Sequence, residues 1–183
     1  MDCSVPEPRP FTTDNFSHKF NGPGIRYEVA LSIHSAQIVW INGPFQPGVH
    51  NDLAIFRMGL KQKLDQHNQR GLADDAYGGE DPGTCVTKRG FRLSRTTDDS
   101  GNFLKMANTV LARHETINAR LKIFSCLTSY RHPYDKHASV FTAVAVLVQI
   151  NVSTDSPLFD IDNEDIEELQ PGFDMLNIST HSI

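Results

Sequence analysis

Two stretches of the chain, IRYEVALSIH at residues 25–34 and QIVWING at residues 37–43, decide the expected fold. In the first stretch, apolar residues occupy every second position from Tyr27 to Ile33, which is the period of a strand with one buried face. The second stretch is rich in β-branched and aromatic residues, which favour strands. Because only a short break separates the two, we predict an antiparallel β-hairpin, closed by a loop in NGPFQPG at residues 42–48.

The rest of the chain combines helical and strand-like patterns without an internal repeat. Apolar residues three and four positions apart predict helices, whereas Gly, Asp and Arg without periodicity predict a loop. The predicted elements are an irregular entry at residues 4–24, a short helix at 51–64, the end of a buried strand at 70–77, a long loop at 78–101, an amphipathic helix at about 102–127 and a buried core helix, apolar nearly all round, at 136–152. This order predicts a mixed α/β domain.

The composition is that of an ordinary globular domain. With 39% hydrophobic and 21% charged residues among 183, it excludes collagen, coiled coils and a fully disordered chain. The charge is uneven: residues 153–183 contain eight acids and no Lys or Arg, and the preceding residues hold the other 14 acids against 17 bases, a net charge of +3. We therefore predict a mildly basic body, residues 1–152, and an acidic, disordered tail at residues 153–183.

Short patterns exclude further classes of protein. The chain contains no run of 18 apolar residues, so no membrane span is predicted. The N-terminus lacks the basic and apolar regions of a signal peptide. Three widely spaced cysteines without a CxxC pair argue against a disulfide framework or a structural zinc site, and they fit a reducing compartment. We therefore expect no membrane partner and no zinc.

Three carboxylates are placed where a fold can bring them together. Asp52 begins the short helix, Asp74 follows the strand in LADDAY, and Glu115 lies beside the apolar stripe of the long helix. Such oxygens suit Mg²⁺, which keeps several waters and needs few carboxylates, and paired ions of this kind serve phosphoryl transfer. From spacing alone each residue has another interpretation, because an Asp at a helix start is usually an N-cap and a Glu on a helix is usually solvated.

The order of several short motifs resembles the catalytic domain of DDE transposases of the PIF/Harbinger kind, a group of DDE superfamily endonucleases. The matching stretches are SHKFNGPGIRYEVALSI at residues 17–33, IVWINGPF at 38–45, GVHNDLAIFR at 48–57, LADDAY at 72–77, HETINARLKIFSCL at 114–127 and AVAVLVQI at 143–150. Two departures are visible. One residue is inserted between His50 and Asp52 relative to the G-x-x-H-D element of the family, and Ala76 replaces the glycine of its D-x-G-Y element.

The resemblance implies an RNase H-like fold, in which a mixed sheet is flanked by helices, for a partial catalytic domain at residues 1–152. It makes Asp52, Asp74 and Glu115 the ligands of Mg²⁺ or Mn²⁺ in a site for DNA cleavage and strand transfer. It also implies a nuclear location if the source is eukaryotic, and a cytoplasmic location otherwise.

The first acid of the family is not matched. It lies in a D-G-T-like strand just upstream of the part that DCSVPEPRPF at residues 2–11 matches, so the resemblance implies that the first strand is missing or incomplete. Asp2 falls about three positions after the expected acid, and an odd offset turns a strand residue to the opposite face. We therefore expect the chain as written to be impaired in cleavage, and we expect an unpaired sheet edge through which copies can associate.

Basic residues between the second and third matched acids predict contact with DNA. They are Lys88, Arg89, Arg92 and Arg95, in the segment KRGFRLSR. Clustered bases around an aromatic residue, here Phe91, suit phosphates and an unstacked base. Lys122 lies two helical turns after Glu115 on the same face and is a further candidate. The alternatives are a solvated basic loop and an ordinary surface lysine.

Two functions of different classes follow from these observations. The first is a metal-dependent nuclease or transposase domain, favoured by the three matched acids. The second is a catalytically inactive, transposase-derived fragment that acts as a DNA- or protein-binding module, favoured by the unmatched first acid. Whether the chain is an enzyme therefore stays open at the level of the sequence.

Overall fold

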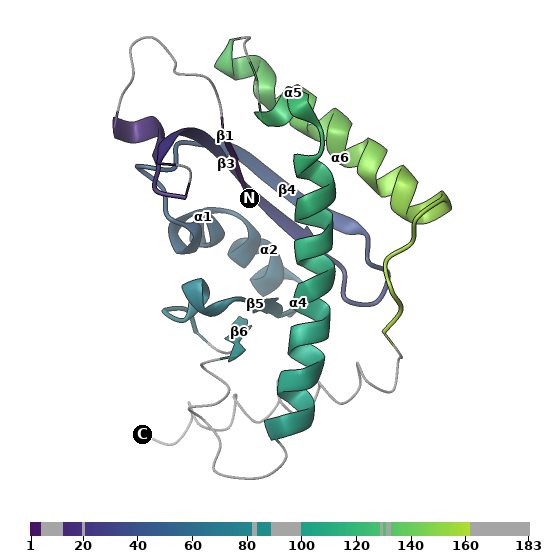
Figure 1. Cartoon of the computed structure of the whole chain (residues 1–183). Helices are drawn as coiled ribbons and strands as arrows, with labels where there is room; N and C mark the ends of the chain where they lie inside the picture. The colour runs from purple at the N-terminus through teal and green to yellow at the C-terminus, as the bar shows by residue number, and fades with distance from the viewer. Residues whose placement is uncertain are drawn as a thin grey trace. The chain divides into compact units, whose positions relative to one another are not determined.

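The computed structural model describes residues 1–4, 13–19, 21–81, 84–88, 100–128, 130 and 133–161, and these form a mixed α/β structure, as predicted. Contacts divide the chain into two compact units. The first contains Met1–Asn51 and His114–Leu158, and the second contains Asp52–Arg113 and the described residues from Phe159 onward. The long helix α4, Ser100–Lys122, therefore contributes its first part to the second unit and its last turns to the first unit (Figure 1).

The first unit is built on an antiparallel sheet of four strands. Its elements are β1 (Asp2–Ser4), a 3₁₀ turn η1 (Thr13–Asn15), β2 (Phe16–Ser17), β3 (Gly22–Leu31) and β4 (Ile38–Phe45). The strand β3 is central, because Arg26 lies opposite Asp2 of β1 on one side and opposite Phe45 of β4 on the other side. The predicted β3–β4 hairpin is confirmed. Strand β2 lies within residues 4–24, for which an irregular segment is predicted, and β1 ends where that segment begins; both pair with β3.

The hairpin is longer than its sequence pattern predicts. Its turn closes through a hydrogen bond from the Ala36 N–H to the Ser32 carbonyl, 3.0 Å long, and Ala36 adopts a positive φ of 55°. Strand β4 continues to Phe45, so the prediction of a loop from residue 42 is wrong. A shift of register opposite Gly43 and Pro44 accommodates these two residues, and such irregularities are typical of a strand that, like β4 among the described residues, pairs with one neighbour.

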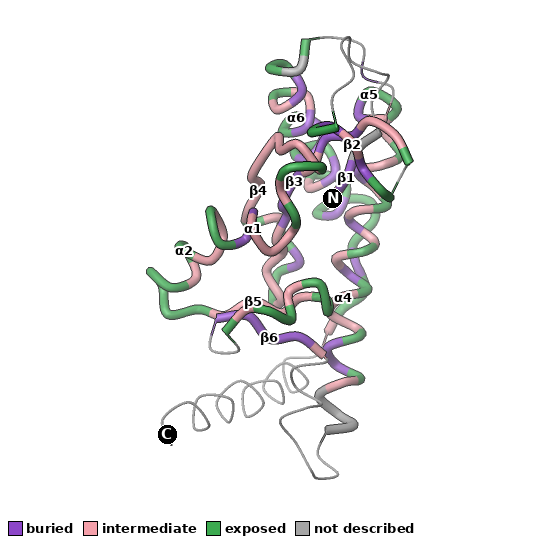
Figure 2. Tube along the Cα trace, turned by 90° about the vertical axis from the view of Figure 1, so that its left-hand side faces the viewer, coloured by how far each residue is buried: buried purple, intermediate pink, exposed green. Residues whose placement is uncertain are grey.

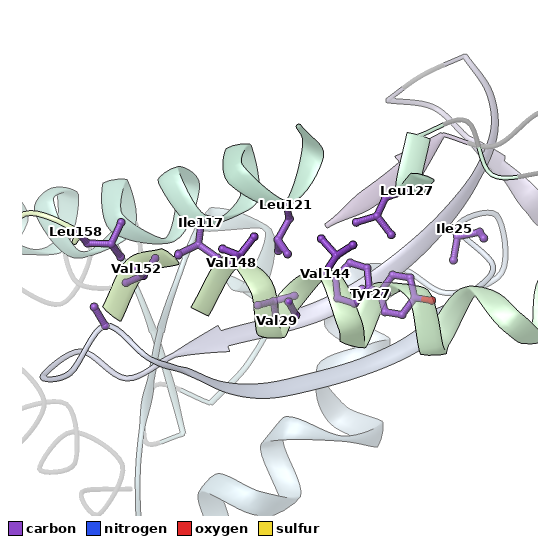
Figure 3. Packing of buried hydrophobic residues seen from close by; sticks show 13 residues of the cluster. Ile25, Tyr27, Val29, Ile117, Leu121, Leu127, Val144, Val148, Val152 and Leu158 are labelled. Carbon is purple, nitrogen blue, oxygen red and sulfur yellow. The ribbon is translucent and has the colours of Figure 1, made fainter. Parts of the chain in front are cut away.

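The remaining helices of the first unit pack on one face of this sheet. They are α5 (Ser125–Thr128), the 3₁₀ turn η3 (Tyr134–Lys136) and α6 (His137–Thr154), together with the last turns of α4. The alternation predicted for β3 is confirmed for Ile25, Tyr27 and Val29, which point into the core (Figure 3), but the strand ends before Ile33, and Glu28 on the opposite face is buried as well. In the core, Ile25, Tyr27 and Val29 meet residues of α4, α5 and α6, namely Ile117, Leu121, Leu127, Phe141, Val144 and Val148.

Helix α6 is buried along one face only. The predicted core helix forms, but the expectation of burial nearly all round is wrong, because Val146, Leu147 and Ile150 are between 52% and 54% exposed. The helix lies on the sheet as an outer layer, so only its side that faces β3 and α4 is shielded from water. By length and composition alone α6 is able to cross a membrane, a property that core helices of soluble proteins share.

The second unit contains short elements. They are α1 (Asp52–Met58), α2 (Leu60–Gln66), β5 (Gly71–Ala73), the 3₁₀ turn η2 (Asp75–Tyr77) and β6 (Cys85–Thr87), and β5 pairs with β6 in parallel. The single helix predicted at residues 51–64 is divided at Gly59, which leaves the helical conformation. A strand ends before Asp74 as predicted, although its residues are half-buried rather than buried.

Strand β6 corrects the prediction of a continuous loop at residues 78–101. It is buried along its whole length, whereas α2 contains no buried residue (Figure 2). Val86 packs with Met106 and Ala107 of α4 and with Ile161 in a small apolar core. The predicted acidic tail is therefore packed at its start, because Leu158 lies in the first core and Ile161 in the second. Residues 162–183 of that tail lie outside the described part of the chain.

Candidate metal centre

Asp74 is the best-defined of the three predicted carboxylates. It directly follows β5, at the carboxyl end of a strand that is paired in parallel with β6. Its Oδ1 accepts a hydrogen bond of 3.0 Å from the N–H of Ala76, so Asp74 caps the 3₁₀ turn η2. This bond fixes the side chain at an exposed position at the end of the strand. The carboxyl ends of parallel strands are the usual place for ligand-binding side chains in α/β proteins.

Asp52 begins helix α1, in the same unit as Asp74, and is half-buried. Two contacts join α1 to the segment that Asp74 begins. The ring of Phe56 meets that of Tyr77 edge-on, with centroids 5.6 Å apart. A Cβ added to Gly79 would lie 3.2 Å from Leu53, so the segment passes close over the first turn of the helix. Asp52 and Asp74 therefore stand on two elements that pack against each other.

A charged network reinforces the same junction, and its centre is Glu80. Its carboxylate accepts hydrogen bonds from Arg57 of α1, at 2.8 Å, and lies 3.1 Å from Nζ of Lys61 of α2. Although burial acts to raise the pKa of Glu80, bonds from Arg57, from the Asp81 N–H and from Lys61 lower that pKa to about 2. Glu80 is thus ionised at any neutral or mildly acid pH.

Sequence reasoning missed Glu80, because it lies in a segment without periodicity. One weak signal was present: Arg57 and Lys61 are four residues apart, which places two cations on neighbouring turns of a helical segment. Nothing in the sequence indicates that their partner lies 19 residues or more further along the chain.

Glu115 is exposed on α4 and belongs to the first unit, whereas Asp52 and Asp74 belong to the second. Among the residues that the structure describes, no three His, Cys, Asp or Glu side chains are grouped to hold a metal ion. Two carboxylates nevertheless fit the needs of Mg²⁺, because this ion keeps several waters and is usually held by one or two carboxylates together with substrate phosphates. Of the three predicted carboxylates, Asp52 and Asp74 lie within one unit.

Asp2 is engaged in a different way. Its Oδ1 accepts from Nε of Arg26 at 2.7 Å, and its Oδ2 accepts from Nη2 of Arg26 at 3.1 Å and from Ser17 at 3.0 Å. Although burial opposes it, the Arg26 guanidinium holds the pKa of Asp2 below its ordinary value. Both carboxylate oxygens are therefore occupied by protein donors.

The predicted DNA-binding residues fall in different places. Lys88 directly follows β6, and its Nζ lies 3.0 Å from Oδ1 of Asn108. Lys122 is the last residue of α4 and is half-buried. Arg89, Arg92 and Arg95 lie outside the described residues.

Comparison with protein-family models, with curated proteins and with solved structures found no match to this chain.

Proposed function

We propose that the chain is a divalent-metal-binding nuclease domain of the DDE kind that acts on DNA phosphodiesters. Its fold would then be an RNase H-like variant in which Asp52 and Asp74 serve as metal ligands. One observation carries the proposal: Asp74 stands at the carboxyl end of a parallel strand, and its segment packs on the helix that Asp52 begins. The motif order GVHND, LADDAY and HETINARLK is the second support.

The bound cation would stabilise the negative charge that develops on phosphodiester oxygens during cleavage. The residues of this chain would hold it in place. The N–H of Ala76 occupies Oδ1 of Asp74 and thereby orients the second oxygen, which remains able to act as a ligand. Lys88, the basic residues after it and Lys122 would neutralise DNA phosphates, which sets affinity but not sequence preference.

The test is calorimetric titration of Mn²⁺ into the purified chain and into two variants. Asp74→Asn removes a proposed ligand, whereas Asp135→Asn changes a carboxylate that is 70% exposed in the other unit and is the matched control. The proposal predicts that Asp74→Asn loses most of the Mn²⁺ affinity and that Asp135→Asn keeps it. Equal affinity in all three proteins would show that the cation binds elsewhere.

A second candidate, an inactive DNA- or protein-binding module, is favoured by the Asp2–Arg26 pair. A carboxylate that receives three protein hydrogen bonds is a poor metal ligand, because binding would require breaking them. The two candidates differ in plasmid nicking with Mg²⁺ or Mn²⁺. Nicking that disappears in Asp74→Asn indicates the nuclease, and DNA binding without nicking indicates the module.

A further inference from the structure

We propose that Glu80 is a positioning residue that fixes the Asp74 segment against the helix begun by Asp52. The inference rests on the proposed function, because it assigns to Glu80 the task of holding two metal ligands at a constant separation. Glu80 would touch neither cation nor DNA. It would act through Arg57, through Lys61 and through the backbone of the segment.

Arg57 makes two hydrogen bonds across the junction. Nε of Arg57 donates to Glu80 at 2.8 Å, and Nη2 of the same guanidinium donates to the carbonyl of Gly79 at 2.9 Å. Arg57 of α1 therefore binds both the side chain of Glu80 and the backbone of Gly79, at the far end of the segment that starts at Asp74.

Lys61 connects Glu80 to α2 and to the start of β6. Its Nζ lies 3.1 Å from Glu80 and donates to Oγ1 of Thr84 at 3.2 Å, and that hydroxyl donates to Asp65 at 3.1 Å. Thr84 is buried and directly precedes β6. The segment between β5 and β6 is thus attached to both helices near its end, whereas at its start the Asp74 cap is formed within the segment itself.

The negative charge at Glu80 is central to this arrangement. The side chain of Glu80 is only 6% exposed and that of Lys61 is 26% exposed, whereas that of Arg57 is 51% exposed, so the Glu80–Lys61 pair is better shielded from water than the Glu80–Arg57 pair. Without that charge, the cations Arg57 and Lys61 would lose the carboxylate that they share. Asp74, Glu80 and Lys61 all lie close enough to Cys85 to influence the pKa of its thiol, which burial first of all raises to about 12.

Glu80→Gln tests this role because it keeps the shape of the side chain and removes the charge. We expect Mn²⁺ affinity to fall about tenfold, since loss of the groups that orient metal ligands typically costs about 10–100-fold. We also expect ¹⁵N relaxation to show the backbone order parameters of Asp74–Gly79 falling from about 0.85 towards about 0.6, the change from rigid to flexible.

The control is Val148→Ala, a core truncation in the first unit, where Val148 is buried. It lowers stability without touching the junction, so it should change neither Mn²⁺ affinity nor the order parameters of Asp74–Gly79. If the control changes both as much as Glu80→Gln does, Glu80 is merely structural and the inference is overturned.

The comparison with Asp74→Asn distinguishes failure of the positioning role of Glu80 from failure of the proposed metal-binding function. If Asp74→Asn loses Mn²⁺ and Glu80→Gln keeps it with a rigid segment, the positioning role is overturned and the proposed function stands. If Asp74→Asn keeps Mn²⁺, the proposed function fails, and the positioning role fails with it even where Glu80→Gln loosens the segment. Loss of Mn²⁺ in both variants, with loosening only in Glu80→Gln, is the expected result.

Discussion

The hydroxyl of Tyr27 lies 2.8 Å from Nδ1 of His137 inside the core of the first unit. The imidazole is fully buried, and the ring of Tyr130 meets it edge-on, with centroids 4.6 Å apart. Burial lowers the pKa of His137, and the carbonyl of Leu127 acts in the opposite direction. Because His137 is the first residue of α6, the positive end of the helix dipole also disfavours its protonation. The pair therefore joins β3 to α6 through a neutral histidine.

Acid should weaken this link. A histidine whose pKa is lowered on folding binds its proton more readily in the unfolded chain, so stability is lost as pH falls below about 6.5 and is unaffected above it. In His137→Gln this loss should be absent, and the free energy of unfolding should fall less steeply between pH 6.5 and 5. Urea unfolding at a series of pH values measures it, with the exposed His34→Gln as control. Parallel pH profiles for wild type and His137→Gln would contradict the assignment.

The Asp2–Arg26 pair should make a large contribution to the stability of the first unit. Removing one partner of a buried ion pair typically costs about 3–5 kcal/mol, because the other charge is left uncompensated. We expect Asp2→Ala to approach this loss and Asp2→Leu combined with Arg26→Met to lose much less. Since the pKa of Asp2 is lowered, its contribution is present above pH 3.8 and is lost as pH falls below that value. Equal losses in the single and double variants, measured by chemical denaturation, would rule out this explanation.

His114 should limit self-association through the sheet edge. Tyr27 exchanges two backbone hydrogen bonds with Met1, and two residues further along β3 the carbonyl of Val29 accepts from Nε2 of His114 at 2.9 Å instead. Alternate residues of an antiparallel strand face the same edge, so His114 occupies a position that another strand would use. Sedimentation should show more association for His114→Ala than for wild type, and Thr109→Ala, whose hydroxyl bonds only the Lys105 carbonyl of its own helix, provides the control. Identical association would mean that His114 does not protect this edge.

DNA binding should be salt-sensitive and independent of sequence. Each neutralised phosphate contributes a slope of about −0.9 to log K against log[salt], so charge-neutral variants of Lys88 and Lys122 should each reduce the slope by about one contact. Fluorescence anisotropy with two unrelated duplexes measures this. We also expect the acidic tail to compete with DNA for the basic residues. A deletion that tests this competition should start after Ile161, because Leu158 and Ile161 are packed in the two cores. Unchanged affinity at low salt after this deletion would contradict competition.

Much of the fold could be predicted where one pattern runs over many residues. The alternation from Tyr27 to Ile33 predicts β3, and the helical spacing after residue 102 predicts α4. Strands β1 and β6 were missed because three residues are too few to show a period. Their pairing is set by contacts with β3 and β5, which are distant in the sequence.

The candidate site was predictable residue by residue but not as a geometry. Motif order singled out Asp52 and Asp74, and the structure places both within one unit on elements that touch. Glu115 was singled out in the same way and lies in the other unit. Glu80 has no signal in its own segment, since its environment is created by two helices that precede it in the sequence.

Paramagnetic broadening by Mn²⁺ tests the central claim most directly, because it reports where a cation sits without requiring catalysis. Mn²⁺ is added in substoichiometric amounts to ¹⁵N-labelled protein, with Mg²⁺ as the diamagnetic control. The account predicts that the amide signals of Asp52, Leu53 and Asp74–Tyr77 broaden first, and that Asp74→Asn abolishes this selectivity. Broadening that begins elsewhere in the chain, or that is unchanged in Asp74→Asn, would contradict a metal site built on Asp52 and Asp74.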